Sequence, residues 1–149
     1  MRRFLYLAIL FFLFEHSVYA QSITDGYWIN DSRDQIIQFY EKSNLIYGKL
    51  VWLKDSLDDN QEIRRDIYNE NPKLRSRKII GIEILTGLKG KKNGRKWYDG
   101  SYYYFDGGSN YNANMYLEDD VLYIKGYWWW FKFLGRTKKW HRHNKPFAS

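Results

Sequence analysis

A series of short apolar and aromatic runs, separated by turn-forming residues, is the feature that most constrains this fold. Tyr, Trp, Phe and Ile are abundant and the chain has only two prolines. No long segment carries helical spacing, so the runs are typical of β-strands. They span residues 26–30, 35–40, 45–53, 78–85, 96–105, 111–117, 121–127 and 131–141. About eight strands is the number at which a closed sheet is just filled by side chains or holds one small ligand.

The links between these runs indicate how the strands are connected. Residues 106–110 and 118–120 are short and rich in Asp, Gly and Asn, which is typical of hairpins. The sequence therefore predicts an all-β fold, a single up-and-down antiparallel barrel. Residues 54–77 are the exception: this link is long, acidic and then basic. We expect a short helix near 60–67 and a structural or functional role for the link.

Alternation within the runs indicates which side chains face the interior. Each of the faces assigned here belongs to a run that contains or adjoins a glycine, as at bends or under large neighbours. The expected interior residues are Ile46, Gly48, Leu50 and Trp52 in the third run, Ile80, Ile82 and Ile84 in the fourth, and Leu122 and Ile124 in the seventh.

The first twenty residues have the organisation of a secretory signal peptide. Arg2 and Arg3 precede an apolar run at 4–14, and Ala20 is the small residue expected before cleavage. Cleavage there leaves residues 21–149 as one barrel domain. The apolar run is shorter than the ~20 residues of a comfortable membrane span, although an uncleaved anchor is the alternative. We expect an exported protein, periplasmic or secreted.

Net charge and cysteine content limit which kinds of partner and which covalent modifications we expect. Removal of the leader changes the net charge from +7 to +6, because Arg2, Arg3 and Glu15 leave with it. For a basic exported protein, an anionic membrane surface or envelope polysaccharide is a better partner than nucleic acid. The chain has no cysteine, so the fold relies on its core rather than on disulfides, and lipoprotein acylation is excluded.

A polar segment precedes the fourth run. It contains Asp66 and Glu70 followed by Arg75 and Arg77. Charges beside a sheet are costly unless they are paired, so we expect the acids to neutralise the arginines and clamp the long link. The alternative is that the two arginines form an anion-binding site.

The order of several short motifs carries a family resemblance. These motifs cover nearly all of the mature chain: Gly26-Tyr27-Trp28, 47–53, Asp66 with Asn71-Pro72, Leu74-Arg75-Ser76-Arg77, Ile80-Gly81-Ile82, Trp97, Gly100, Tyr111 with Ala113, Gly126-Tyr127, Gly135-Arg136-Thr137, Trp140 and Arg142. In this order the chain resembles the family DUF2147, exported bacterial lipocalin-like small β-barrel proteins. It departs from the family at 106–108 and in the aromatic loop after Tyr127. The resemblance implies fold and export but no activity.

The resemblance also implies how one end of the barrel is closed. In lipocalin-like barrels a Gly-x-Trp motif near the start and an arginine near the end lie together. Here the matching residues are Gly26, Trp28 and Arg142, which is near Trp140. A guanidinium on an indole face contributes about 1–2 kcal/mol when desolvated. The residues expected to have structural roles are Gly26, Trp28, Asp66, Asn71, Pro72, Gly81, Trp140 and Arg142.

Residues 127–131 are five consecutive aromatic residues. Side chains in a strand alternate, so these rings cannot all face the interior. They are expected to contact an anionic membrane, for which Lys125, Lys132 and Arg136 are suited, to stack on a ligand at the barrel mouth, or to pack under a neighbouring loop. The candidate ligand-binding residues are Trp52, Arg75, Arg77, Tyr104, Trp128, Trp129 and Trp130.

The sequence contains no catalytic motif, and we expect neither metal nor cofactor. His141 and His143 lie among basic residues that oppose a cation. The basic hairpin 89–96 is interpreted as a solvated loop, or as a surface attracted to anionic lipid or polysaccharide. Three functions remain open: a binding protein for a small apolar or amphipathic molecule, a non-enzymatic envelope structural or interaction protein with a filled barrel, and, with least support, a hydrolase using Asp66 or Glu83.

Overall fold

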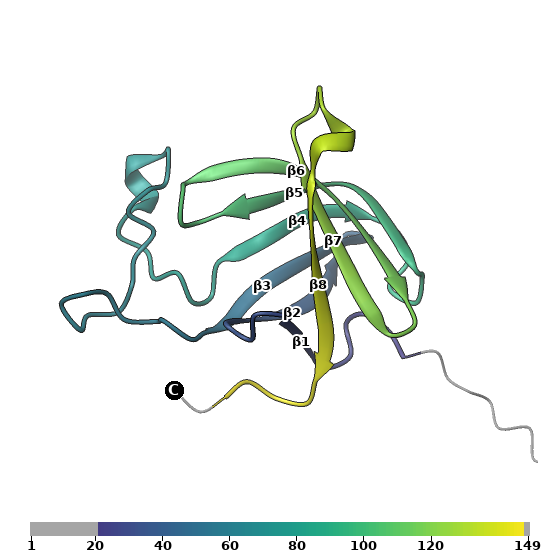
Figure 1. Cartoon of the computed structure of the whole chain (residues 1–149), viewed down its shortest axis with the longest axis horizontal. Coiled ribbons are helices and arrows are strands. Elements are labelled where there is room, and N and C mark those ends of the chain that lie inside the picture. Colours follow the sequence, from purple (N-terminus) through teal and green to yellow (C-terminus); the bar gives the residue numbers. More distant parts are fainter. Residues whose placement is uncertain (1–20, 148–149) are drawn as a thin grey trace, which may run out of the picture.

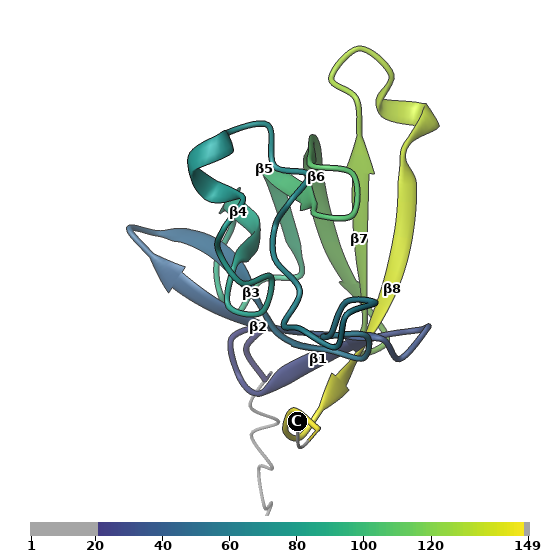
Figure 2. The same cartoon turned by 90° about the vertical axis from the view of Figure 1, so that its left-hand side faces the viewer.

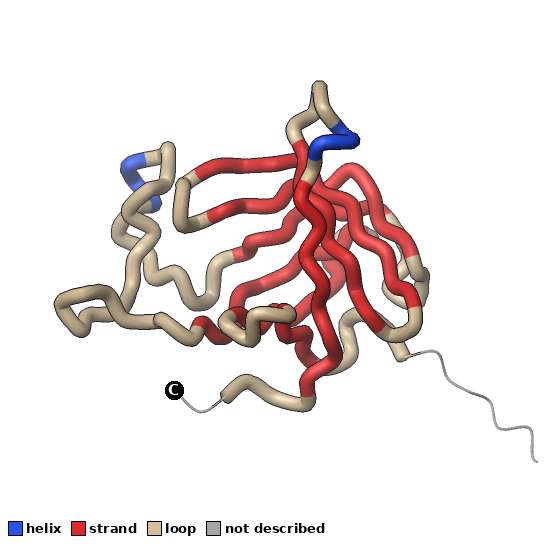
Figure 3. Tube along the Cα trace, viewed as in Figure 1, coloured by secondary structure: helices blue, strands red, loops and turns tan. Residues whose placement is uncertain are grey.

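The computed structural model describes residues 21–147, which form a closed barrel of eight antiparallel strands (Figures 1 and 3). Each strand pairs with the next in sequence, and the last pairs with the first. The strands are β1 (Tyr27–Asn30), β2 (Gln35–Lys42), β3 (Leu45–Leu53), β4 (Glu83–Lys89), β5 (Lys96–Tyr104), β6 (Ser109–Glu118), β7 (Val121–Tyr127) and β8 (Arg136–His143). The predicted up-and-down barrel is confirmed. The predicted leader, residues 1–20, lies outside the described residues.

Two short 3₁₀ helices interrupt the connections, η1 (Pro72–Leu74) and η2 (Lys132–Leu134). No helix within residues 21–147 is long and apolar enough to cross a membrane. The helix predicted near 60–67 was wrong. The Asp58 carboxylate accepts hydrogen bonds from the backbone N–H groups of Asn60 and Glu62, and such bonds compete with helical ones.

Two strands begin later than predicted. The fourth starts at Glu83 rather than 78, because the chain turns at 79–82, where the Ile82 N–H donates to the Ile79 carbonyl and Gly81 has a φ of +100°. The eighth starts at Arg136 rather than 131, since Phe131 to Leu134 turn through η2. The aromatic tract therefore leaves the sheet after Tyr127, where β7 ends.

Up-and-down connectivity gives the barrel two different ends. The closed end has tight turns at Ser43-Asn44 and Asp119-Asp120, all four residues with positive φ, the β4–β5 connection, the segment before β1 and the end of β8. The open end carries the remaining connections, including the long one between β3 and β4, which extends past the strand ends in Figure 1 and lies in front of them in Figure 2.

The closed end is sealed by the segment before β1. Trp28 is fully buried, and its Nε1 donates to the Ile23 carbonyl at 3.0 Å. Arg142 lies directly opposite Trp28 on β8, with its guanidinium carbon 4.5 Å from the indole centroid. It also donates to the carbonyls of Gln21, Ser22 and Asp25. Arg142 thereby ties the last strand to the segment before the first.

Most of the predicted interior residues are buried, but Ile80 is only partly buried and Trp52 does not face the interior. The β2–β3 register shifts between Ile36 and Ile37, so Trp52 lies opposite Ile36. Ile36 in turn lies opposite Ile29, which alternates with the interior residue Trp28. Trp52 is therefore on the outer face, where it contacts the Phe147 ring at 4.8 Å. The interior assignment of Trp52 was wrong because alternation does not continue through a bulge.

We predict that Trp28→Ala lowers the free energy of unfolding by about 3–5 kcal/mol, as for other fully buried aromatic residues. Arg142→Ala should cost about 2 kcal/mol, because it removes the cation–π contact and several charged hydrogen bonds. In urea melts the double variant should be less destabilised than the sum by about 1 kcal/mol. Trp129→Ala, at an exposed tryptophan, is the control. Additive effects would contradict the contact.

Candidate functional site

A cavity of about 480 Å³ opens at the end of the barrel opposite the Trp28 seal. Side chains from β5 to β8 and from the β7–β8 loop line it. The lining residues are Tyr102, Tyr104, Tyr111, Ile124, Gly126, Tyr127, Trp128, Leu134, Gly135, Arg136, Lys138 and Trp140. Its wall is thus mainly aromatic, as in pockets for small organic molecules.

Gly126 on β7 leaves space in the wall of this cavity. It ends a row of small residues, with Ala113 opposite on β6 and Gly100 beyond it on β5, but Leu88 fills the space beside Gly100. A Cβ added at Gly126 would lie 3.7 Å from the Tyr102 ring and 3.8 Å from the Tyr111 Cβ. A larger side chain at Gly126 would therefore occupy the space between β7 and these tyrosines.

The same face of β8 brings two cations to the cavity. Arg136 lies opposite Gly126, and Lys138 lies opposite the buried Ile124. Neither cation has a carboxylate partner among the described residues, whose ion pairs involve other side chains. Two positive charges without a counterion beside an aromatic wall favour an anionic group.

The indole of Trp140 adds an unused hydrogen-bond donor. Trp140 is fully buried and lines the cavity, and its Nε1 has no partner among residues 21–147. An unsatisfied buried donor costs about 1–3 kcal/mol. A bound acceptor, or water, would recover this cost.

Tyr102 in the cavity wall stays protonated at neutral pH. Burial, and secondarily the nearby Asp106 carboxylate, raise the pKa of Tyr102 to about 12. Tyr102 and Tyr111 lie opposite one another on β5 and β6, and Tyr111 contacts the Trp128 ring at 4.8 Å. The wall is therefore continuous with the loop after β7.

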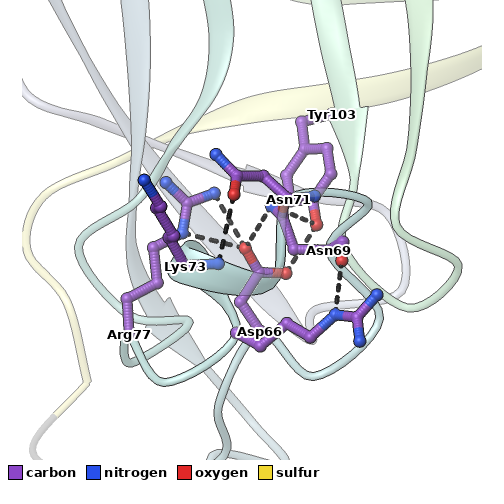
Figure 4. Close-up of polar contacts among 7 residues, drawn as sticks. Asp66, Asn69, Asn71, Lys73, Arg77 and Tyr103 are labelled. Carbon is purple, nitrogen blue, oxygen red and sulfur yellow. Dashed lines mark hydrogen bonds and ion pairs between the residues drawn. The ribbon is translucent and has the colours of Figure 1, made fainter.

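A second polar cluster pins the long β3–β4 connection (Figure 4). Asp66 is fully buried. Its Oδ2 accepts from the Nε and Nη2 of Arg77 at 2.8 Å, and from the Asn69 side chain at 2.8 Å. Its Oδ1 accepts from the Tyr103 hydroxyl at 2.5 Å. The carboxylate thus fastens the connection to β5.

The other polar residues of this segment hold its backbone. Arg75 donates to the Asn69 carbonyl at 2.7 Å rather than to Asp66, and Glu70 is exposed with no ion pair among the described residues. Asn71 caps η1 by accepting from the Lys73 N–H, and Pro72 is the first residue of η1. The expected pairing of Asp66 with an arginine is present only for Arg77, because the Arg75 side chain satisfies a backbone carbonyl instead.

The predicted ligand-binding residues are dispersed. Tyr104 and Trp128 line the cavity, whereas Trp129 and Trp130 lie beyond it on the exposed loop. Arg75 and Arg77 belong to the cluster around Asp66, and Trp52 lies on the outer face. Sequence reasoning missed the lining residues Tyr102, Tyr111, Arg136 and Lys138. For the two residues on β8 the sequence did contain a signal, because Arg136 and Lys138 alternate along the strand with Trp140 and Arg142.

The other candidate sites offer fewer groups suited to binding or catalysis. A depression of about 600 Å³ lies on the outer side of β5 to β7 and includes Lys96, Tyr98 and Tyr116. His141 Nε2 lies 2.6 Å from Asp31 Oδ1. Within residues 21–147 no group of three His, Cys, Asp or Glu side chains is arranged to hold a metal ion. Asp66 is enclosed and Glu83 accepts a hydrogen bond from Tyr40, so the two carboxylates postulated for a hydrolase are both engaged.

An eight-stranded up-and-down barrel, sealed at one end and hollow at the other, defines a lipocalin-like protein. A solved structure described as protein HP1028 from the human pathogen Helicobacter pylori, belonging to the lipocalin family, is similar, with a TM-score of 0.69 and 22% sequence identity over 83% of this chain and 85% of that one. Residues 26–142 match the family described as uncharacterized protein conserved in bacteria (DUF2147), and the chain belongs to that family. No functionally curated protein matches it.

We predict that Asp66→Asn destabilises the protein by on the order of 2–4 kcal/mol, because the amide has no charge to pair with Arg77 and only one acceptor oxygen for the donors of Arg77, Asn69 and Tyr103. Asp66→Asn combined with Arg77→Met should cost less than Asp66→Asn alone. Urea melts measure both. Glu70→Gln, a carboxylate in the same segment without an ion pair, should melt like wild type. A wild-type melt for Asp66→Asn would exclude the clamp.

From the raised pKa of the Tyr103 hydroxyl we predict how the free energy of unfolding changes at alkaline pH. Burial, and secondarily its hydrogen bond to Asp66, raise the pKa of Tyr103 to about 12, above ~10 for an unfolded tyrosine. The folded state therefore favours the protonated phenol. Its stabilising contribution is complete below pH ~10 and is lost as pH rises to ~12.

Urea melts across this pH window, with phenolate absorbance as a second readout, measure the effect. Tyr103→Phe should flatten the decline, while leaving the contributions of Tyr40 and Tyr102, whose pKa values are also raised to about 12. Parallel profiles for Tyr103→Phe and wild type would contradict the assignment.

Proposed function

We propose that the protein is an exported lipocalin-like binding protein that holds a small amphipathic anion in the open-end cavity. The apolar part of the ligand lies among Tyr102, Tyr104 and Tyr111, and its acidic head lies beside Arg136 and Lys138. The observation that carries the proposal is the pairing of an aromatic cavity with two cations that have no acidic partner within residues 21–147.

The shape of the site supports a small ligand rather than a polymer. The half of the barrel next to the closed end is filled by Trp28, Trp97 and Phe39, all almost completely buried. The hollow is therefore confined to the open end. Trp140 forms the boundary between the filled and hollow parts, and its free Nε1 offers a donor to the ligand.

Binding rather than catalysis is proposed because the described residues that line the cavity include no carboxylate, histidine, serine or cysteine. The Tyr102 hydroxyl, with a pKa of about 12, keeps its proton near neutral pH. The carboxylate with the most contacts, Asp66, is enclosed in a structural cluster. Export is part of the proposal, on the strength of the leader at 1–20, with Gln21 expected as the first residue of the exported product.

The second candidate is a non-enzymatic envelope protein whose barrel serves only as a scaffold. It is favoured by the three fully buried tryptophans Trp28, Trp97 and Trp140, which fill much of the interior. This candidate differs in one respect: it requires no ligand in the cavity.

Calorimetric titration with decanoate and with decanol tests the proposal. Decanoate should bind more tightly, because only its head is charged. Lys138→Gln should weaken decanoate binding by about ten-fold and leave decanol unchanged, since a charged hydrogen bond is worth about 1.5–3 kcal/mol. Gly126→Val, which fills the space beside Tyr102, should weaken both ligands.

Lys139→Gln is the matched control. Lys139 neighbours Lys138 on β8 but alternates to the outer face, where its Nζ lies 5.8 Å from the Tyr123 ring. Equal losses for Lys138→Gln and Lys139→Gln would exclude a specific head-group site. Absence of binding for both probes would favour the filled scaffold.

A further inference from the structure

The loop between β7 and β8 forms an exposed apolar projection, which we call the tip (Trp128 to Leu134). Figures 1 and 2 both show it extending at the top of the view, beyond the other loops. Its most exposed side chains are Phe133, at 77%, and Trp129 and Leu134, each at 69%. Trp128, Trp130 and Phe131 are also exposed. A contiguous apolar patch of this kind marks an interaction site on a soluble protein.

The rings of the tip pack mainly on each other. Trp128 and Trp130 stack at 5.6 Å, Trp129 meets the edge of Trp130 at 5.1 Å, and Phe131 meets Phe133 at 6.1 Å. The tip backbone is partly self-satisfied, since the Phe131 N–H donates to Trp128 and the Leu134 N–H donates to Phe131. Internal bonds of this kind lower the cost of entering an apolar phase.

The charge around the tip indicates which kind of partner it binds. From Val121 to Ser149 the sequence contains no Asp or Glu. Lys132 lies within the tip, where its Nζ is 5.9 Å from the Tyr127 ring. Behind the tip, β7 and β8 carry further cations, namely Lys125, Arg136, Lys138 and Lys139. The occupant must therefore accept aromatic rings and carry negative charge.

We propose that the tip inserts into the head-group region of a membrane that contains anionic lipid. Tryptophan is enriched at this depth because its ring is apolar and its N–H is polar. Lysines around the inserted rings reach the lipid phosphates, and each contributes to binding by attraction to the negative surface. A second copy of this chain fits less well, because the tips of two copies would bring their positive charges together.

Membrane docking at the tip also orients the cavity. Trp128 and Leu134 belong to both the tip and the cavity lining, so the open end would face the lipid. This consequence rests on the proposed function, whereas the docking itself does not. A defect in docking is distinguishable from a defect in ligand binding, because the residues tested below lie outside the cavity.

Co-sedimentation with vesicles tests the proposal on residues 21–149. Vesicles of phosphatidylcholine are compared with vesicles in which phosphatidylglycerol replaces part of it. Wild type should bind the anionic vesicles, with a blue shift in tryptophan emission, and binding should weaken as salt is raised. Trp129→Ser with Phe133→Ser should abolish binding. Lys125→Gln with Lys132→Gln should weaken it about five-fold per cation removed.

Two control variants locate the contact. Tyr98→Ser removes an exposed ring on the outer side of β5, and Lys91→Gln with Lys92→Gln removes two cations at the opposite end of the barrel. Both should bind like wild type. The proposal is overturned if the lysine pair at 91 and 92 proves to be required, if the tip variant still sediments with vesicles, or if wild type binds neither vesicle. Loss of a dimer in the tip variant, seen by sedimentation velocity without lipid, would assign the tip to a second copy instead.

Discussion

The contact between Arg142 and the segment before β1 is the constraint on which the remaining architecture depends. A closed barrel requires its first and last strands to pair, and they are the most distant in sequence. The β1–β8 ladder aligns Trp28 with Arg142, and the guanidinium then binds three carbonyls of the N-terminal segment. Burial lowers the pKa of Arg142 from its usual value, yet an arginine stays charged under these conditions. One side chain thereby fixes the register of closure and seals one end.

Because Trp28 seals one end of the barrel, the long connections lie at the other end. The connections of the closed end are short, whereas the open end carries the β3–β4 connection and the tip. The Asp66 cluster converts the first of these from a long loop into a fixed wall by bonding it to Tyr103. Gly108 completes this contact, since a Cβ there would lie 1.8 Å from the Tyr68 carbonyl oxygen. No comparable set of bonds covers the tip in the described part of the chain.

The barrel was predictable from sequence because its signals are local. Alternating apolar residues and hairpin links such as Asp119-Asp120 determine strand number and order, whatever the remaining chain does. The Trp28–Arg142 contact was accessible through the family resemblance. The failures have other causes. A register shift moves Trp52 to the outer face. Two local turns, which the apolar pattern does not reveal, replace the predicted helix at Asp58 and remove the aromatic tract from the sheet after Tyr127.

The candidate site was only partly predictable, for a related reason. Tyr104 and Trp128 were among the candidate ligand-binding residues, and both line the cavity. Alternation places Arg136 and Lys138 on the face of Trp140, but it does not show what that face meets, and they were not chosen. Only the closed register places them opposite Gly126 and Ile124. The absence of acidic residues after Asp120 then acquires a structural meaning: it leaves the cations of β7, the tip and β8 without neighbours of opposite charge on their own segment. An aromatic surface and unpaired positive charges therefore lie together at one end of the barrel. That combination suits the binding of an anionic amphiphile, whether free or in a membrane.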